Sequence, residues 1–202
     1  MKSHLLFIPV ALLVGTLLVH GQGAFIYDQQ SSTNEGALPY GAGVVIQQIA
    51  SPYGQSFTPT LSAVDFIRLK LNDNDPNNSL SATLRVNLRT NSINGSILAS
   101  TASVSLTNGF TGVVNFFFSS SLSLTPGVVY YFQPVVQSGD LWNLEAGEYN
   151  YPGGSVFVGG FAATASDYWF REGIVPEPSA GLLFLFGSGV VAWCHRKKRN
   201  NG

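Results

Sequence analysis

The sequence predicts an all-β fold, a single antiparallel β-sandwich of jelly-roll-like form, over residues 25–174. Three observations predict it. Only 10% of the residues are charged, while glycine and aromatic residues are abundant, a composition that suits pleated, half-buried surfaces. Apolar and polar residues alternate with a period of two, and turn signals recur at short intervals. About 150 residues are enough for one domain with its own core.

The alternation is clearest in two stretches, 66–71 and 84–89. Apolar residues at every second position are Ile67, Leu69 and Leu71 in the first stretch, and Leu84, Val86 and Leu88 in the second. The residues between them include Arg68 and Lys70, and Arg85, Asn87 and Arg89. Each stretch therefore predicts a strand with one apolar and one polar face, as in half-buried antiparallel sheets.

The remaining strands are shorter and are separated by turns rich in Gly, Pro, Asn and Asp. The expected strands are 44–49, 96–100, 103–106, 112–118, 128–136, 155–158 and 168–171. The turns between strands are expected at 73–78, 94–95, 108–109, 126–127 and 152–154. Within 128–136, Tyr130 and Phe132 should share one face and Tyr131 should take the other.

The two ends of the chain differ from this pattern. Residues 1–24 have a basic residue, Lys2, near their start, an apolar run from Leu5 to Val19 and small residues at their end. This pattern predicts a secretory signal peptide. Residues 175–202 contain Val175, Pro176, Glu177 and Pro178, an apolar stretch of 15 residues over 180–194, and a basic cluster. The cluster is Arg196, Lys197, Lys198 and Arg199.

The apolar stretch 180–194 predicts a short transmembrane helix. The basic cluster behind it should stay in the cytoplasm by the positive-inside rule, which places the body outside. The order of the three parts resembles the PEP-CTERM sorting signal of exported bacterial proteins. That resemblance implies that Val175, Pro176, Glu177 and Pro178 form the motif read by an exosortase-type membrane protease, and that membrane anchoring is transient. It also implies a cell-surface or extracellular protein in the context of extracellular polysaccharide and biofilm.

The charged residues of the body exclude several kinds of site. Residues 25–174 hold five basic and ten acidic residues, a difference of −5, and no His or Cys. An acidic body predicts no nucleic-acid partner. Without His or Cys it can hold no Ser-His-Asp or Cys-His site, no zinc site of those ligands and no disulfide. We therefore expect no catalytic residues and no enzymatic activity.

The stretch from 54–59 to 128–134 resembles β-sandwich modules of secreted bacterial proteins, which look like carbohydrate-binding jelly rolls. Four aromatic residues lie in or near Gly-rich segments close to carboxylate and amide residues: Trp142, Tyr149, Tyr151 and Trp169. Aromatic rings beside hydrogen-bonding groups are what a glycan site needs. The alternative is that these rings close one end of the sandwich.

Two further possibilities concern carboxylates. Asp140, Glu145 and Glu148 are close in sequence, and an acid and base pair of this kind would make the chain a small secreted polysaccharide-active enzyme. Asp73, Asp75 and Asn77 have the spacing at which a calcium loop begins, without its later ligands, so structural calcium is only weakly supported and a turn is the main expectation. No metal or other cofactor is predicted.

Overall fold

The computed structural model describes residues 24–36, 44–46, 52–147, 149–163 and 166–176. All regular secondary structure in these ranges is β-strand, and all of the strand pairs are antiparallel. The prediction of an all-β antiparallel fold is confirmed for this part of the chain. The strands belong to one compact unit, Ala24–Glu177.

Most of the strands are short and a few are long. In chain order they are β1 (Ile26–Gln30), β2 (Val44–Ile46), β3 (Gly54–Phe57), β4 (Ala63–Asp73), β5 (Ala82–Thr90), β6 (Ile97–Ser100), β7 (Val104–Leu106), β8 (Thr111–Ser123), β9 (Tyr130–Gly139), β10 (Trp142–Leu144), β11 (Ala146–Gly147), β12 (Val156–Val158), β13 (Phe161–Ala163), β14 (Asp167–Tyr168) and β15 (Phe170–Ile174).

The first sheet is built around β4. Strand β8 pairs with β4 from Ala63 to Asn72 and occupies one of its edges. Strand β15 pairs with β4 over Phe66–Leu69, and β10 pairs with it over Leu71–Asp73, so these two share the other edge. Strand β1 extends the sheet beyond β15, and β2 extends it beyond β10.

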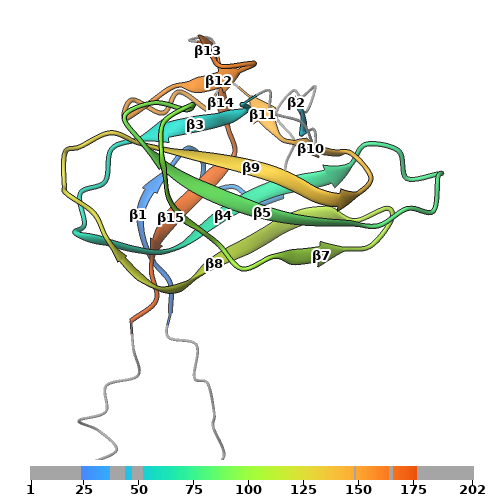
Figure 1. Cartoon of the computed structure of the whole chain (residues 1–202), viewed down its shortest axis with the longest axis horizontal. Helices are drawn as coiled ribbons and strands as arrows, with labels where there is room; N and C mark the ends of the chain where they lie inside the picture. The colour runs from blue at the N-terminus through green and yellow to red at the C-terminus, as the bar shows by residue number, and fades with distance from the viewer. Residues whose placement is uncertain (1–23, 37–43, 47–51, 148, 164–165, 177–202) are drawn as a thin grey trace, which may run out of the picture. The chain divides into compact units, whose positions relative to one another are not determined.

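The second sheet has the order β13-β12-β3-β9-β5-β6, and β7 also pairs with β5. Strands β5 and β9 pair along their length, from Ala82 opposite Gly139 to Thr90 opposite Tyr130. A separate pair, β11 and β14, forms a small third sheet. In Figure 1 the long strands β5 and β9 run beside each other, and β4 and β8 do the same.

The two larger sheets share one hydrophobic core. Strand β4 contributes Ile67, Leu69 and Leu71, and β5 contributes Leu84, Val86 and Leu88. Phe132 of β9 and Phe170 of β15 join the sheets, with ring centroids 5.2 Å apart. The side chains that the alternation assigned to the apolar face of 66–71 and 84–89 are therefore all in the core. Each such buried side chain contributes about 1.5–3 kcal/mol.

Tyr130 and Phe132 belong to the core while Tyr131 lies on the other face, partly exposed, as the alternation predicted. The expected turns fall between strands, except that Asp73, where the turn 73–78 was expected to begin, is the last residue of β4. At the turn of 108–109, Gly109 has a φ of 75°, a left-handed conformation that glycine adopts without steric cost. Strands β1, β10, β11 and β13 were not predicted, because they are short; β1, β10 and β11 also gain their hydrogen bonds from strands distant in sequence.

Candidate functional site at the chain ends

The first and last strands of the body are neighbours. Figure 1 shows β1 and β15 side by side, and Ile26 lies opposite Ile174. The backbones approach closely here: a Cβ atom at Gly173 would stand 1.9 Å from the carbonyl oxygen of Ile26, so glycine is required at this position. The described chain therefore begins and ends at adjacent positions of one sheet.

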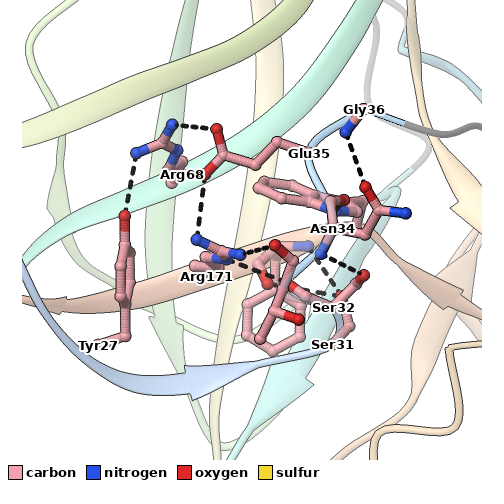
Figure 2. A network of polar contacts seen from close by, with 11 residues as sticks. Tyr27, Ser31, Ser32, Asn34, Glu35, Gly36, Arg68 and Arg171 are labelled. Carbon is pink, nitrogen blue, oxygen red and sulfur yellow. Dashed lines mark hydrogen bonds and ion pairs between the residues drawn. The ribbon is translucent and has the colours of Figure 1, made fainter.

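A carboxylate clamps the segment after β1 to the outer face of this sheet. Glu35 accepts from Arg68 of β4 at 2.8 Å and from Arg171 of β15 at 3.0 Å (Figure 2). Arg68 also donates to the Tyr27 hydroxyl of β1 at 3.0 Å. We call Glu35, Arg68 and Arg171 the Glu35 clamp. It ties together β1, β4 and β15, which are far apart in sequence.

Arg171 makes further contacts that fix the covering segment. Its Nε donates to the carbonyl of Ser32 at 3.0 Å, and its guanidinium lies 4.8 Å from the centre of the Tyr27 ring and 5.4 Å from that of Trp169. The Trp169 indole N–H donates to the carbonyl of Asn34 at 2.8 Å. Residues 31–36 thus close over the outer face of β15.

The beginning of the predicted sorting motif is fastened to the body. The Val175 amide donates to the Asp65 carboxylate at 2.7 Å, one residue after β15 ends at Ile174. Val175 and Pro176 are half-buried. The last strand is therefore complete before the motif begins.

A buried carboxyl lies on the inner side of the same strands. Glu172 is fully buried, and both of its carboxylate oxygens lack a hydrogen-bond donor in the described structure. Burial, and then the negative charge of Asp28, raise the pKa of Glu172 to about 9. Glu172 is therefore protonated at neutral pH, a state in which it can donate to Asp28.

Asp28 remains ionised because it has its own donors. Burial acts to raise the pKa of Asp28, but the amides of Leu61 and Thr60, at 2.9 and 2.8 Å, and the Thr60 hydroxyl together lower it. The two carboxyls therefore differ in protonation although they are neighbours.

The aromatic residues predicted as a glycan platform do not form an exposed surface. Trp142 and Trp169 are fully buried and Tyr151 is 8% exposed. The Tyr151 hydroxyl donates to Gln29 at 2.9 Å, and the Tyr149 hydroxyl donates to Glu145 at 2.7 Å. The alternative that these rings close the body agrees better with their burial. Tyr149 is half-buried, so three of the four rings are too covered for a sugar to stack on them.

The carboxylates considered for glycoside hydrolysis have other partners. Glu145 is buried in an ion pair with Lys70 at 3.3 Å, and Asp140 accepts from the side-chain amide of Asn78. Glu148 lies outside the described residues. Glu145 therefore neutralises a buried ammonium group here.

The Asp73 loop is a turn stabilised by its own carboxylates. Asp73 accepts the amides of Asp75 at 3.0 Å and Gly109 at 2.7 Å, and Asp75 accepts the amide of Asn77 at 3.2 Å. The contacts with Asp75 and Asn77 are Asx-type turn contacts, and the contact with Gly109 ties the turn to the one before β8. Within the described ranges, no group of three His, Cys, Asp or Glu residues is placed to hold a metal ion.

Several predictions fall outside the described residues. They concern the signal peptide 1–24 except for Ala24, Glu177 and Pro178 of the motif, the apolar stretch 180–194, and the basic cluster Arg196, Lys197, Lys198 and Arg199. In the ranges that are described, no helix is long and apolar enough to span a bilayer. These predictions therefore stay predictions.

Comparisons with known proteins give no relative. No family model matches the chain, and a search of curated proteins finds no significant match.

The sequence analysis missed the Glu35 clamp and the Glu172 carboxyl. Glu35 stands in a polar segment with no strand pattern, and its two arginine partners are 33 and 136 residues away. A signal was present in Arg171-Glu172, two adjacent charged residues at the end of the expected strand 168–171. Their alternation places one side chain on each face, which predicts that a charge is buried.

Proposed function

We propose that the chain is an exported surface or extracellular-matrix protein that is sorted through its C-terminal tail by an exosortase-type membrane protease. In this proposal the tail anchors the protein in the membrane only until it is processed. The body is a structural, glycan-associated component of the cell surface and has no catalytic role.

The observation that carries the proposal is the junction between β15 and the motif. Strand β15 ends at Ile174, and the next residue, Val175, is held by Asp65. A cut at or after the motif removes no strand and no core residue of the described body. A removable sorting tail requires such a junction, because the body must stay folded after the tail is lost.

The position of the chain ends supports the same proposal. The residues that precede Ala24 and follow Pro176 connect to neighbouring strands, β1 and β15. A signal peptide and a sorting tail attached there would both leave from one edge of the body. The body could then stay on the outer side of the membrane while either segment is still inserted.

For the body itself we infer a β-sandwich of jelly-roll-like form. The support is that the two larger antiparallel sheets contribute to one core, which is how two packed sheets bury their apolar faces. Such folds host many functions, so the fold alone does not assign a ligand.

Mass spectrometry of the native C-terminus, from envelope and medium fractions, tests the proposal. We expect a C-terminal peptide that ends between Pro176 and Ser179. A matched variant, Glu177→Gln, should retain the tail, because it removes the only charge of the motif. A mature protein that still carries Arg199 in both fractions would show that the tail is a permanent anchor.

A further inference from the structure

The outer face of the second sheet combines cations, amides and aromatic rings. Its side chains alternate with the core residues of the same strands. Register places Arg89 opposite Tyr131, Asn87 opposite Gln133, and Arg85 opposite Val135. We call this surface the Arg85 face, defined by Arg85, Asn87, Arg89, Tyr131, Gln133 and Phe157.

The two arginines of this face have no carboxylate partner among the described residues. The other basic residues of the body are in ion pairs, two with Glu35 and one with Glu145. The side chain of Arg85 makes no hydrogen bond with the described part of the chain, and its Nε is buried without a partner. A body with twice as many acidic as basic residues thus leaves two cations uncompensated, and both are on one face.

The Arg89 guanidinium is held in a fixed orientation. Its Nε donates to the Gln133 side chain at 2.8 Å, and its Nη1 donates to the carbonyl of Gly95 at 2.5 Å. Asn87 supports Gln133 from the next position, with an amide contact of 3.4 Å, and accepts from Ser100 at 2.7 Å. These two bonds use two of the five N–H donors of the Arg89 guanidinium.

The amides and the arginines of this face differ in exposure. Asn87 is 4% exposed and Gln133 is 8% exposed, whereas Arg85 and Arg89 are half-buried. Burial also lowers the pKa of Arg89 from its ordinary value, which is the effect expected of a cation without a counter-charge. Pre-oriented, partly desolvated guanidinium groups bind carboxylates better than flexible, hydrated ones.

An aromatic pair lies next to Arg89 on this face. Tyr131 is directly opposite Arg89 in the β5–β9 pair. Its ring meets that of Phe157 edge to face, with centroids 5.5 Å apart, and both residues are half-buried. A half-covered ring beside a fixed cation can contact the apolar side of a sugar ring while the cation takes an acidic substituent.

We propose that the Arg85 face binds an acidic polysaccharide, with Arg85 and Arg89 taking carboxylate groups of the sugar chain and Tyr131 and Phe157 contacting a sugar ring. The two arginines are four residues apart on one strand, which is about 13 Å at about 3.3 Å per residue. A chain of several acidic sugars can therefore reach both arginines, which a single acidic sugar cannot. The inference gives the glycan association proposed above a place on the molecule.

A nucleic acid fits this face less well, because its binding depends on several Lys and Arg side chains that neutralise phosphates. The acidic body leaves two cations without a carboxylate partner among the described residues. An acidic peptide has no rigid ring to place against the aromatic pair, and it loses more conformational entropy on binding. These two polymers serve as comparison ligands in the experiment.

Calorimetric titration of the full-length protein with oligogalacturonate tests the inference. We expect binding that weakens at least about tenfold in the Arg85→Gln/Arg89→Gln double variant. The methyl ester of the same oligosaccharide lacks the negative charges, and its binding to the unchanged protein should be weaker by a similar factor. Tyr131→Ala should also weaken binding, without changing the number of charges.

The matched aromatic control is Phe161→Ala. Phe161 is 81% exposed, and it is one register position away from the residue opposite Phe157, so its side chain points away from the Arg85 face. Its removal should leave binding unchanged.

Equal binding by the double variant, or equal binding of the neutral ester, would overturn the proposal. Tighter binding of poly-L-glutamate or of oligothymidylate than of oligogalacturonate would also overturn it. If the double variant does not fold, Arg85→Gln alone answers the question, because Arg85 makes no hydrogen bond to the described body. Purified protein is used throughout, so neither outcome depends on how the tail is processed.

Discussion

The outer faces of the two larger sheets have similar sequence patterns but differ in whether their cations are paired with carboxylates. Strand β4 alternates apolar residues with Arg68 and Lys70, and β5 alternates them with Arg85 and Arg89. On the first sheet, carboxylates from distant segments neutralise the cations: Glu35 for Arg68 and Glu145 for Lys70. On the second sheet no described carboxylate does so. The same alternation therefore builds a closed structural face in one place and an uncompensated one in the other.

The largest difference should appear when a buried ion pair of the first sheet is broken. Glu145→Gln leaves the Lys70 ammonium group, whose side chain is 6% exposed, without its carboxylate. We expect a loss of about 3 kcal/mol in the free energy of unfolding, measured by urea denaturation. The double variant Lys70→Met/Glu145→Leu should recover most of it, because it removes both charges. A single variant as stable as the unchanged protein would show that the pair is not needed.

The next largest effect concerns the buried carboxyl group of Glu172, which has no cationic partner among the described residues. Its pKa is near 4.5 when unfolded and about 9 in the folded state. The stability from its protonated form is complete below the unfolded pKa and decreases as the pH rises toward the folded one. The slope is at most about 1.4 kcal/mol per pH unit.

Replacing Glu172 by Gln should remove this slope. Between pH 6 and pH 8 the unchanged protein should lose about 2.5 kcal/mol relative to the Glu172→Gln variant, measured by urea denaturation at each pH. Asp28→Asn is the companion variant, because it removes the negative charge that helps to raise the Glu172 pKa; the slope should become shallower. Parallel pH profiles of the unchanged protein and Glu172→Gln would contradict the assignment.

The Glu35 clamp should have a smaller effect than the buried pair, although it contacts two arginines. Glu35 is 41% exposed, so solvent screens its ion pairs. We expect Glu35→Gln to cost about 1 kcal/mol, and added salt should weaken the unchanged protein toward the variant. Asp75→Asn is a charge-matched control on a distant turn and should show little of this salt effect. A salt-independent difference would mean that the clamp acts through packing alone.

The contrast between the two faces also marks what the sequence can predict. Alternation identified β4 and β5 and the core residues on each, because a period of two reports which side of a strand is apolar. It does not report whether the other side is covered. That depends on the β1–β15 pairing, which brings Glu35 to Arg171 across 136 residues. For the same reason Trp142 and Trp169 were expected on a glycan-binding surface near Gly-rich segments, although both are buried.

The smallest effect on stability should come from the face that carries the binding proposal. Arg85→Gln should change the free energy of unfolding by no more than about 0.5 kcal/mol, and toward greater stability, because Arg85 has no described partner and its Nε is buried. Arg89→Gln should cost slightly more, since Arg89 bonds to Gln133 and Gly95. Urea denaturation of both variants beside Glu35→Gln measures the contrast directly. If Arg85 lowers stability and is also needed for ligand binding, its role is in binding and not in folding. A large loss in the free energy of unfolding of Arg85→Gln would mean that this face is structural, as the outer face of the first sheet is.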